Sequence, residues 1–336
     1  MSQVFSSIKS FFGNSFHKLK VKGKDFFKIS NLKKHFLGLL VATLLLIIDI
    51  VVAYAVGYRT SHTYIYNATP YVIVLIIAYI LYLLKLFSSN KKSASDLIIV
   101  IFAFFLLWDL AYKTGLVHND LLIPAPEGLF HVFKTDNKYI LEMVWDSLQL
   151  LFWGFLLAII LGTILGLVVG WFQRARDVLI PISNAITLIP PVLMTAWLIM
   201  WFPFRQAAIG IIFLAVFWPV FQGTIVSVAQ IDKKTIDAAK VMGVGNIGMI
   251  FKVVLPYSLP GIITSISKSL RGAFMCLVAA EMIGINGGIG YYAETYKAYA
   301  DYRRVLAGIV TIGVITTLID IIVNKIENQI VKWKKV

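Results

Sequence analysis

The chain has 336 residues, 59% of them hydrophobic, with a formal net charge of +14. Soluble domains contain roughly 45–50% apolar residues, so this excess predicts a polytopic membrane protein and excludes an ordinary soluble domain. The charge alone would suit a nucleic-acid-binding protein, but the placement of the lysines described below excludes that class. A single cysteine, Cys276, excludes an intramolecular disulfide and a cysteine metal cluster.

Residues 1–35 form a strongly basic segment, with eight lysines against one acid, Asp25. Apolar side chains recur at helical spacing from Val4 to Leu19. The pattern predicts either an amphipathic helix on the anionic inner leaflet, with membrane lipid as its partner, or a disordered basic tail.

Two apolar spans follow within residues 36–95, at about 36–56 and 71–87. The first ends in Ala53-Tyr54-Ala55, which mimics a signal-peptidase site. Its length and the long basic segment before it favour an uncleaved anchor. Asp49 lies inside this span, where a charge is costly, so we expect it to face another helix or a polar cavity.

Six further spans fill residues 96–336, each near the roughly 20 residues that a bilayer core requires. They are expected at 96–112, 145–171, 178–202, 207–229, 262–284 and 305–323. The segment 113–144 is expected to lie in water, outside the bilayer core. Eight spans with basic short loops on one side predict an all-α fold in the cell membrane, with both termini in the cytoplasm. The same rule places the loop 231–261 in the cytoplasm.

That loop is the most punctuated stretch of the C-terminal half. Asp232 suits an N-cap before a helix over 233–242, and Gly243 suits its end. Within the helix, the small residues Ala238 and Ala239 leave one side, which also carries Asp237 and Gly243, nearly bare. A bare helix side lets the backbone of another protein come close.

The loop resembles the cytoplasmic loop of ABC importer permeases, which reads Glu-Ala-Ala, three residues, Gly, nine residues, then Ile-x-Leu-Pro. Here Asp237-Ala238-Ala239 is followed at the same spacing by Gly243 and by Val253-Val254-Leu255-Pro256. Asp for Glu keeps the charge, and Val for Ile keeps the shape. By this resemblance, the residues that couple to an ATPase are Asp237, Ala238, Ala239, Gly243, Leu255 and Pro256.

The resemblance extends from about Leu97 to Trp333 and is strongest to the branch that serves nitrate, sulfonate, taurine, bicarbonate and some vitamin precursors. The motifs that carry it are Trp108-Asp109 before Leu122-Ile123-Pro124-Ala125-Pro126, then Pro190-Pro191, Trp218-Pro219, and Ala280-Glu281-Met282-Ile283-Gly284 before Gly287-Gly288-Ile289-Gly290. It implies a six-helix type I permease core at 96–336. The two spans in 36–95 lie outside that core.

The resemblance also implies a non-enzymatic permease subunit without a cofactor or metal. Its partners would be a second permease copy or a related permease, two ABC ATPase subunits and an extracytoplasmic substrate-binding protein, without nucleic acid. The chain has no phosphate-binding Gly-x-x-x-x-Gly-Lys-Ser/Thr loop, and none of its five histidines forms a metal-binding pair. A secondary transporter and a membrane-embedded lipid-modifying enzyme are the alternatives. The first would need inverted repeats, and the second convergent catalytic groups that Glu281, Asp109 and His118 do not form.

Polar and helix-breaking residues inside the spans are the candidates for a translocation path. Gln222 would hydrogen-bond substrate oxygens or a neighbouring helix. Pro190 and Pro191 break the helical ladder at mid-depth and would mark a cavity wall or a gate hinge.

Two charged candidates lie in the seventh span, Arg271 and Glu281. Ten residues separate them, about 15 Å of helix rise, which is too far for a direct pair. Arg271, with Lys268, would snorkel or form an electropositive exit for an anion. Glu281 would line the path or hold the glycine-rich turn through backbone hydrogen bonds.

Overall fold

The computed structural model describes residues 36–55, 67–88, 93–116, 124–284 and 287–330, and within these ranges every regular element is helical. The basic segment 1–35 and its two interpretations lie outside the described residues. The chain divides into two compact units, Met1–Thr135 and Asp136–Val336. The predicted all-α fold is confirmed.

Unit 1 contains four described helices: α3 (Phe36–Ala55), α4 (Thr69–Ser88), α5 (Ser93–Lys113) and α6 (Pro126–Thr135). α3 packs mainly on α5, and α4 contacts both α5 and α6. Aromatic and aliphatic side chains fill the space between them, including the buried Tyr71, Leu75 and Phe102. The outer faces are also apolar, with Leu37 and Leu107 among the most exposed, as expected for helices that meet lipid.

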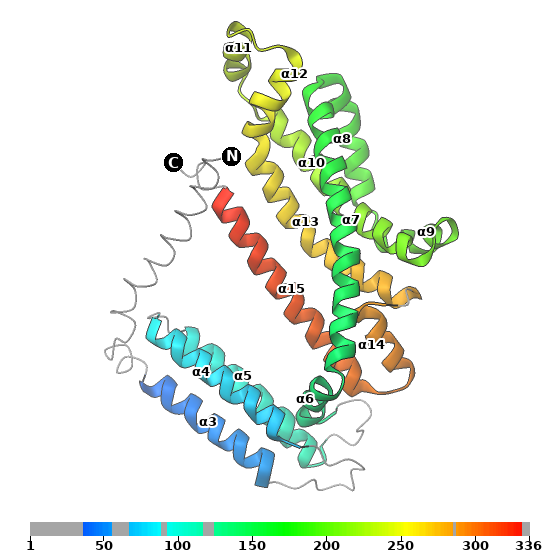
Figure 1. Ribbon diagram of the computed structural model, residues 1–336. Helices are drawn as coiled ribbons and strands as arrows, with labels where there is room; N and C mark the ends of the chain where they lie inside the picture. The colour runs from blue at the N-terminus through cyan, green and yellow to red at the C-terminus, as the bar shows by residue number, and fades with distance from the viewer. Residues whose placement is uncertain (1–35, 56–66, 89–92, 117–123, 285–286, 331–336) are drawn as a thin grey trace. The chain divides into compact units, whose positions relative to one another are not determined.

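Unit 2 begins with the longest described helix, and its second helix, α8, is followed after a break by two short helical segments. Its elements are α7 (Asn137–Trp171), α8 (Gln173–Thr187), the 3₁₀ helix η1 (Pro191–Met194), α9 (Thr195–Trp201), α10 (Phe204–Ala229), α11 (Lys233–Val241), α12 (Asn246–Met249), the π-helix η2 (Ile250–Val254), α13 (Leu255–Gly284), α14 (Ile289–Ala298) and α15 (Tyr302–Ile330). α11 and α12 lie at one end of this unit and α14 at the other (Figure 1).

α10 is the central helix of unit 2 and packs on α7 and α13. A stripe of glycines on α7 permits its close approach. A Cβ at Gly166 would lie 2.6 Å from Thr224 Cβ and 2.8 Å from Phe221 O, and one at Gly170 would lie 2.8 Å from Val228 Cβ. The small-residue stripe therefore serves close helix packing.

In the part of the chain that the structure describes, seven helices are long and apolar enough to cross a membrane, or eight if the bent pair Gln173–Thr187 and Pro191–Trp201 is one span. The chain is therefore a polytopic membrane protein with about eight spans. The region predicted to span the membrane at 178–202 is a bent pair of helices, and the expected break of the helical ladder at Pro190 and Pro191 is confirmed by the 82° bend. Pro190 and Pro191 both lack an N–H, so the helical ladder cannot continue through them.

The described part of segment 113–144 is largely helical, which was not predicted. It contains α6, and α7 begins at Asn137, eight residues before the predicted start at Trp145. The apolar run marks only the part of a helix that lipid surrounds, and polar residues extend the helix beyond it. The sequence did not predict α14, because this helix is short and carries the charged residues Glu294 and Lys297, so it forms no long apolar run.

Candidate functional site

The loop between α10 and α13 begins with a capped helix. The Asp232 side chain accepts a hydrogen bond from the Lys234 N–H at 3.2 Å and so caps α11. Gly243 follows the C-terminus with a φ of 76°, a conformation that favours glycine. The predicted cap and helix end are both confirmed.

The inner side of the loop is tied to the ends of three long helices. Ala239 is only 3% exposed and packs in a cluster with Leu167 of α7, Val228 of α10 and Ile262 of α13. Ala239 is therefore a packing residue of this face and not part of the open side expected from the sequence. Through Ala239, the loop therefore shares a buried apolar cluster with the ends of these helices.

The outer side of α11 is open. Asp237 and Ala238 are exposed there, and Asp237 lies 3.9 Å from Lys240 in a surface ion pair. Val241 is 89% exposed and Met242 75% exposed. The sequence analysis missed these two residues, although two apolar side chains in an otherwise polar loop were a usable signal.

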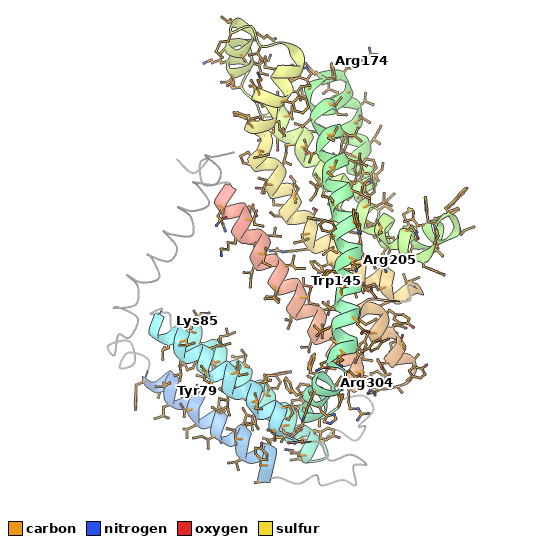
Figure 2. The ribbon with its side chains drawn as sticks, viewed as in Figure 1. Tyr79, Lys85, Trp145, Arg174, Arg205 and Arg304 are labelled. Carbon is orange, nitrogen blue, oxygen red and sulfur yellow. The ribbon has the colours of Figure 1, made fainter. Side chains whose placement is uncertain are left out.

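Gly243 lies next to this open side, and a Cβ built on it would meet no atom within 4 Å. Its own chain therefore leaves room for a side chain. The other two predicted coupling residues, Leu255 and Pro256, form the start of α13, with Pro256 exposed and Leu255 partly buried. Arg174, at the start of α8, lies at the same end of unit 2 (Figure 2).

The candidate path residues do not form one constellation. Gln222 Nε2 donates a hydrogen bond to Asn184 Oδ1, which links α10 to α8. Pro190 is exposed at the break, and Pro191 begins η1. The bond between Gln222 and Asn184 matches the interhelical alternative expected for Gln222. The sequence did not identify Asn184 as the partner. Path roles for all three residues stay predictions.

Arg271 pairs with α15, because its Nε lies 3.2 Å from Asp320 Oδ1. A second contact joins the same two helices, because Thr264 Oγ1 donates to Glu327 Oε1 at 3.1 Å. Thr264 precedes Arg271 by seven residues on α13, and Glu327 follows Asp320 by seven residues on α15. The matched spacing shows that polar contacts join these antiparallel helices at two levels. The Arg271 side chain is still 71% exposed in the single chain.

Glu281 is 1% exposed and holds the glycine-rich turn. Its Oε1 accepts from Ser147 Oγ at 2.6 Å and its Oε2 from the Gly290 N–H at 2.8 Å, while Ser147 Oγ accepts from the Ile289 N–H at 2.9 Å. A carboxylate at the N-terminus of α14 is well placed to accept from its free N–H groups. This geometry matches the turn-holding alternative, and the path role stays a prediction.

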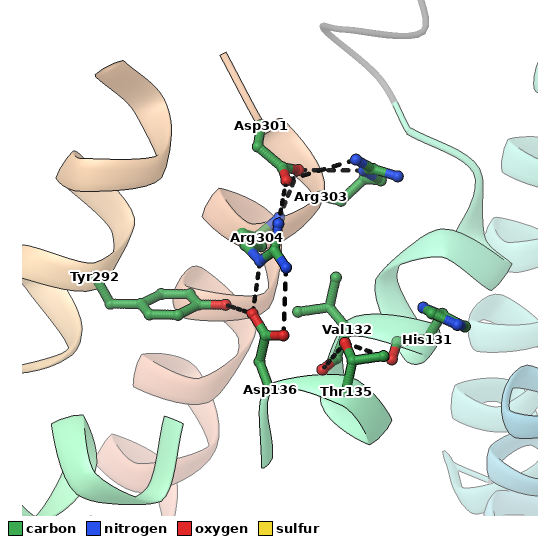
Figure 3. A network of polar contacts seen from close by, with 8 residues as sticks. All are labelled: His131, Val132, Thr135, Asp136, Tyr292, Asp301, Arg303 and Arg304. Carbon is green, nitrogen blue, oxygen red and sulfur yellow. Dashed lines mark hydrogen bonds and ion pairs between the residues drawn. The ribbon is translucent and has the colours of Figure 1, made fainter. Parts of the chain in front are cut away.

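A polar network joins the starts of α7 and α15 (Figure 3). Arg304 bridges two acids, with Nε 2.6 Å from Asp136 Oδ2 and Nη1 2.7 Å from Asp301 Oδ2. Burial alone would raise the pKa of Asp301, but the bonds and charges of Arg303 and Arg304 outweigh it and hold this pKa below its usual range. Tyr292 donates to Asp136 at 3.2 Å, and burial together with Asp136 raises the pKa of this tyrosine.

Across the described ranges, no group of three or more histidine, cysteine, aspartate or glutamate side chains is arranged to hold a metal ion. A protein with these apolar spans and a broken span belongs to the class of polytopic membrane proteins.

Comparison with known proteins gives the family. Residues 154–332 match the family described as "Binding-protein-dependent transport system inner membrane component". The chain is similar to SsuC of Bacillus subtilis (strain 168), named as an aliphatic sulfonates transport permease, with 30% identity over 68% of this chain and 83% of that protein. It is also similar to the taurine transport system permease protein TauC of Escherichia coli (strain K12), with 27% identity over 64% and 81%.

A third relative is the nitrate import permease protein NrtB of Leptolyngbya laminosa, which is 31% identical over 55% of this chain and 67% of that protein. The chain therefore belongs to the binding-protein-dependent ABC importer permeases, within the branch that contains the sulfonate, taurine and nitrate permeases. This membership decides against the secondary transporter and the lipid-modifying enzyme.

Proposed function

We propose that this chain is the membrane subunit of an ATP-driven importer and receives mechanical work from separate ATPase subunits through its loop 231–261. The observation that carries the proposal is the open side of α11. Asp237, Ala238, Val241 and Met242 are exposed there beside Gly243. Apolar side chains that lie open on a polar cytoplasmic loop are typical of a protein contact.

The packing of the loop supports a route for that work. A partner that presses on α11 also moves Ala239, and Ala239 packs on residues of α7, α10 and α13. Displacement of the loop would thus tilt three membrane helices together and would alternately open the path on either side. Two permease chains, in a homodimer or with a related permease, would enclose the path.

The substrate we propose is a small anion such as a sulfonate, taurine, nitrate or bicarbonate, or else a vitamin precursor. The relatives' names support this class. An extracytoplasmic binding protein would deliver the substrate, and both termini would lie in the cytoplasm with loop 231–261. Gln222, Pro190, Pro191, Arg271 and Glu281 remain our candidates for the path.

The test is Gly243→Glu in the complete transporter, reconstituted in vesicles with its ATPase and binding protein. Because a Cβ at Gly243 meets no atom of its own chain, the variant is expected to fold and insert. Its carboxylate would occupy the space of the docking partner. We expect loss of uptake and of binding-protein-stimulated ATP hydrolysis, and undiminished uptake would contradict the docking role.

Gly243→Asn separates docking from backbone strain. Asparagine tolerates the left-handed conformation better than other side chains do, yet still adds bulk. A docking role predicts impaired coupling in both variants. If Gly243→Asn couples normally and only Gly243→Glu fails, close approach at this position is not required.

A further inference from the structure

A cluster of ionisable side chains lies inside unit 1, away from the coupling loop. Asp49 comes from α3, Tyr71 from α4, Asp109 and Lys113 from α5, and Glu127 from α6. Each of the five is at most 2% exposed. All four described helices of the unit thus contribute to one buried polar centre in an otherwise apolar core.

Lys113 organises part of this centre. Its Nζ lies 3.1 Å from Asp109 Oδ2 and 2.9 Å from Glu127 Oε1, and it donates to the carbonyl oxygen of Val52 at 2.8 Å. These contacts satisfy one oxygen of Asp109 and one of Glu127, and none of them involves Asp49.

Several oxygens in the centre have no hydrogen-bond partner among the described protein groups. They are both carboxylate oxygens of Asp49, Asp109 Oδ1, Glu127 Oε2 and the Tyr71 hydroxyl. Four of these oxygens belong to carboxylates, and among the five only the Tyr71 hydroxyl carries a hydrogen to donate when the carboxylates are ionised.

The charges are also unbalanced. Three ionised carboxylates and one ammonium would leave a net charge of −2 in a buried site, and uncompensated buried charge is strongly unfavourable. A bound cation would supply the missing charge, but no set of three acidic side chains in the described ranges is arranged to hold a metal ion. A proton on one carboxylate reduces this net charge to −1 and supplies the missing hydrogen-bond donor.

We propose that this cluster is a proton-binding site in which Asp49 holds a proton at neutral pH. Among the described residues, the other ionisable side chains buried in this centre are Tyr71, Asp109, Lys113 and Glu127, and Tyr112 is buried on the same turn of α5. The proposal concerns unit 1 alone and does not depend on the coupling role of loop 231–261.

Such a site makes the stability of the chain depend on pH. Above the ordinary carboxyl range, near pH 4, the unfolded chain has released this proton while the folded chain keeps it. Stability is then full at low pH and is lost as the pH rises. One extra proton in the folded state raises the unfolding equilibrium constant about tenfold for each pH unit.

The experiment measures the thermal unfolding midpoint of the full-length chain in detergent between about pH 5 and about pH 7, above the ordinary carboxyl range. The wild type is compared with Asp49→Asn and with Asp96→Asn, an exposed carboxylate on α5 that serves as the matched control. We expect the midpoint to fall with rising pH in the wild type and the control, and to fall much less in Asp49→Asn. Equal slopes in all three proteins would overturn the proposal.

A sodium arm distinguishes a proton from a metal cation. At the upper pH, sodium chloride is compared with N-methylglucamine chloride at equal ionic strength. Equal midpoints are expected. Stabilisation of the wild type by sodium, absent in Asp49→Asn, would show a metal cation in the site and would overturn the proton assignment.

Glu127→Gln gives a second route if Asp49→Asn does not fold. It removes a different negative charge from the same cluster and so weakens proton binding at Asp49. The fall in the midpoint should level off at a lower pH than in the wild type. An unchanged pH profile in this variant would contradict a shared proton site.

Discussion

Glu281 shows how one carboxylate connects three helices. It lies on α13, accepts from Ser147 of α7 and accepts from the Gly290 N–H at the start of α14. Gly288 and Gly290 let the backbone approach it, because a Cβ at Gly288 would lie 2.3 Å from Glu281 Cδ. A larger residue than glycine would displace the carboxylate, which explains the glycine-rich turn that follows it in the sequence.

Glu281→Gln is predicted to destabilise the folded chain. With the amide oxygen on the Gly290 N–H, the amide nitrogen would lie at Ser147, and the Ser147 hydrogen would lose the carboxylate oxygen to which it donates. Loss of this buried bond costs about 1–3 kcal/mol. The thermal unfolding midpoint measures the effect. Glu294→Gln is the control, since its exposed pair with Lys297 is worth about 0–1 kcal/mol.

The same variant discriminates between the two roles of Glu281. A normal midpoint together with altered transport kinetics would contradict the structural role and support the path role.

The sequence identified which charged residues lie within the spans, but it did not identify the residues that they contact. Glu281 and Arg271 stood out as charges within a span, and the turn-holding alternative anticipated the Gly290 contact. Ser147 and Asp320, by contrast, are 134 and 49 residues away from their partners. Contacts at that separation depend on helix packing, which a single sequence does not encode in any local pattern.

The pairing of α7 with α10 depends on the absence of side chains at defined points. Gly166 is such a point, because a Cβ there would press on Thr224 and on the Phe221 carbonyl oxygen. Helices in lipid gain little from burial of apolar surface, so close packing has to stabilise them.

Gly166→Leu is therefore predicted to destabilise the chain by about 1–3 kcal/mol, the usual cost of overpacking. Gly313→Leu on α15 is the matched control, because a Cβ at Gly313 meets nothing within 4 Å. Thermal unfolding of both variants in the same detergent gives the comparison. A similar midpoint in the two variants would mean that the stripe on α7 does not carry close packing.

The apolar runs in the sequence predicted where the membrane helices lie but not where each helix begins and ends. α7, α13 and α15 all extend beyond the predicted runs, because a helix continues into polar residues where its backbone bonds remain satisfied. The break at Pro190 was visible in the sequence, since proline cannot donate to the ladder. The 82° bend that follows it was not, because the direction of the chain after a break depends on packing.

The whole chain combines a family core with helices that the family match does not cover. The match spans residues 154–332, whereas α3 and α4 precede it. The predicted boundary between residues 95 and 96 stays a prediction. α5 and α6 belong to the same compact unit as α3 and α4, and they contribute Asp109, Lys113 and Glu127 to the buried cluster. The isolated charge of Asp49 in a span indicated a polar contact at this position. Lys113 and Glu127 were not expected to contribute, because they belong to the segment 113–144 that was predicted to lie in water.

The central claim is that the open side of α11 contacts an ATPase subunit. The most direct test is photo-crosslinking from Met242→Cys in a Cys276→Ser background, in vesicles that hold the complete transporter. Met275→Cys, which is 78% exposed on α13, is the control. We predict a crosslink to the ATPase from position 242 and none from position 275. Uptake that persists without an ATPase crosslink at position 242 would contradict the account.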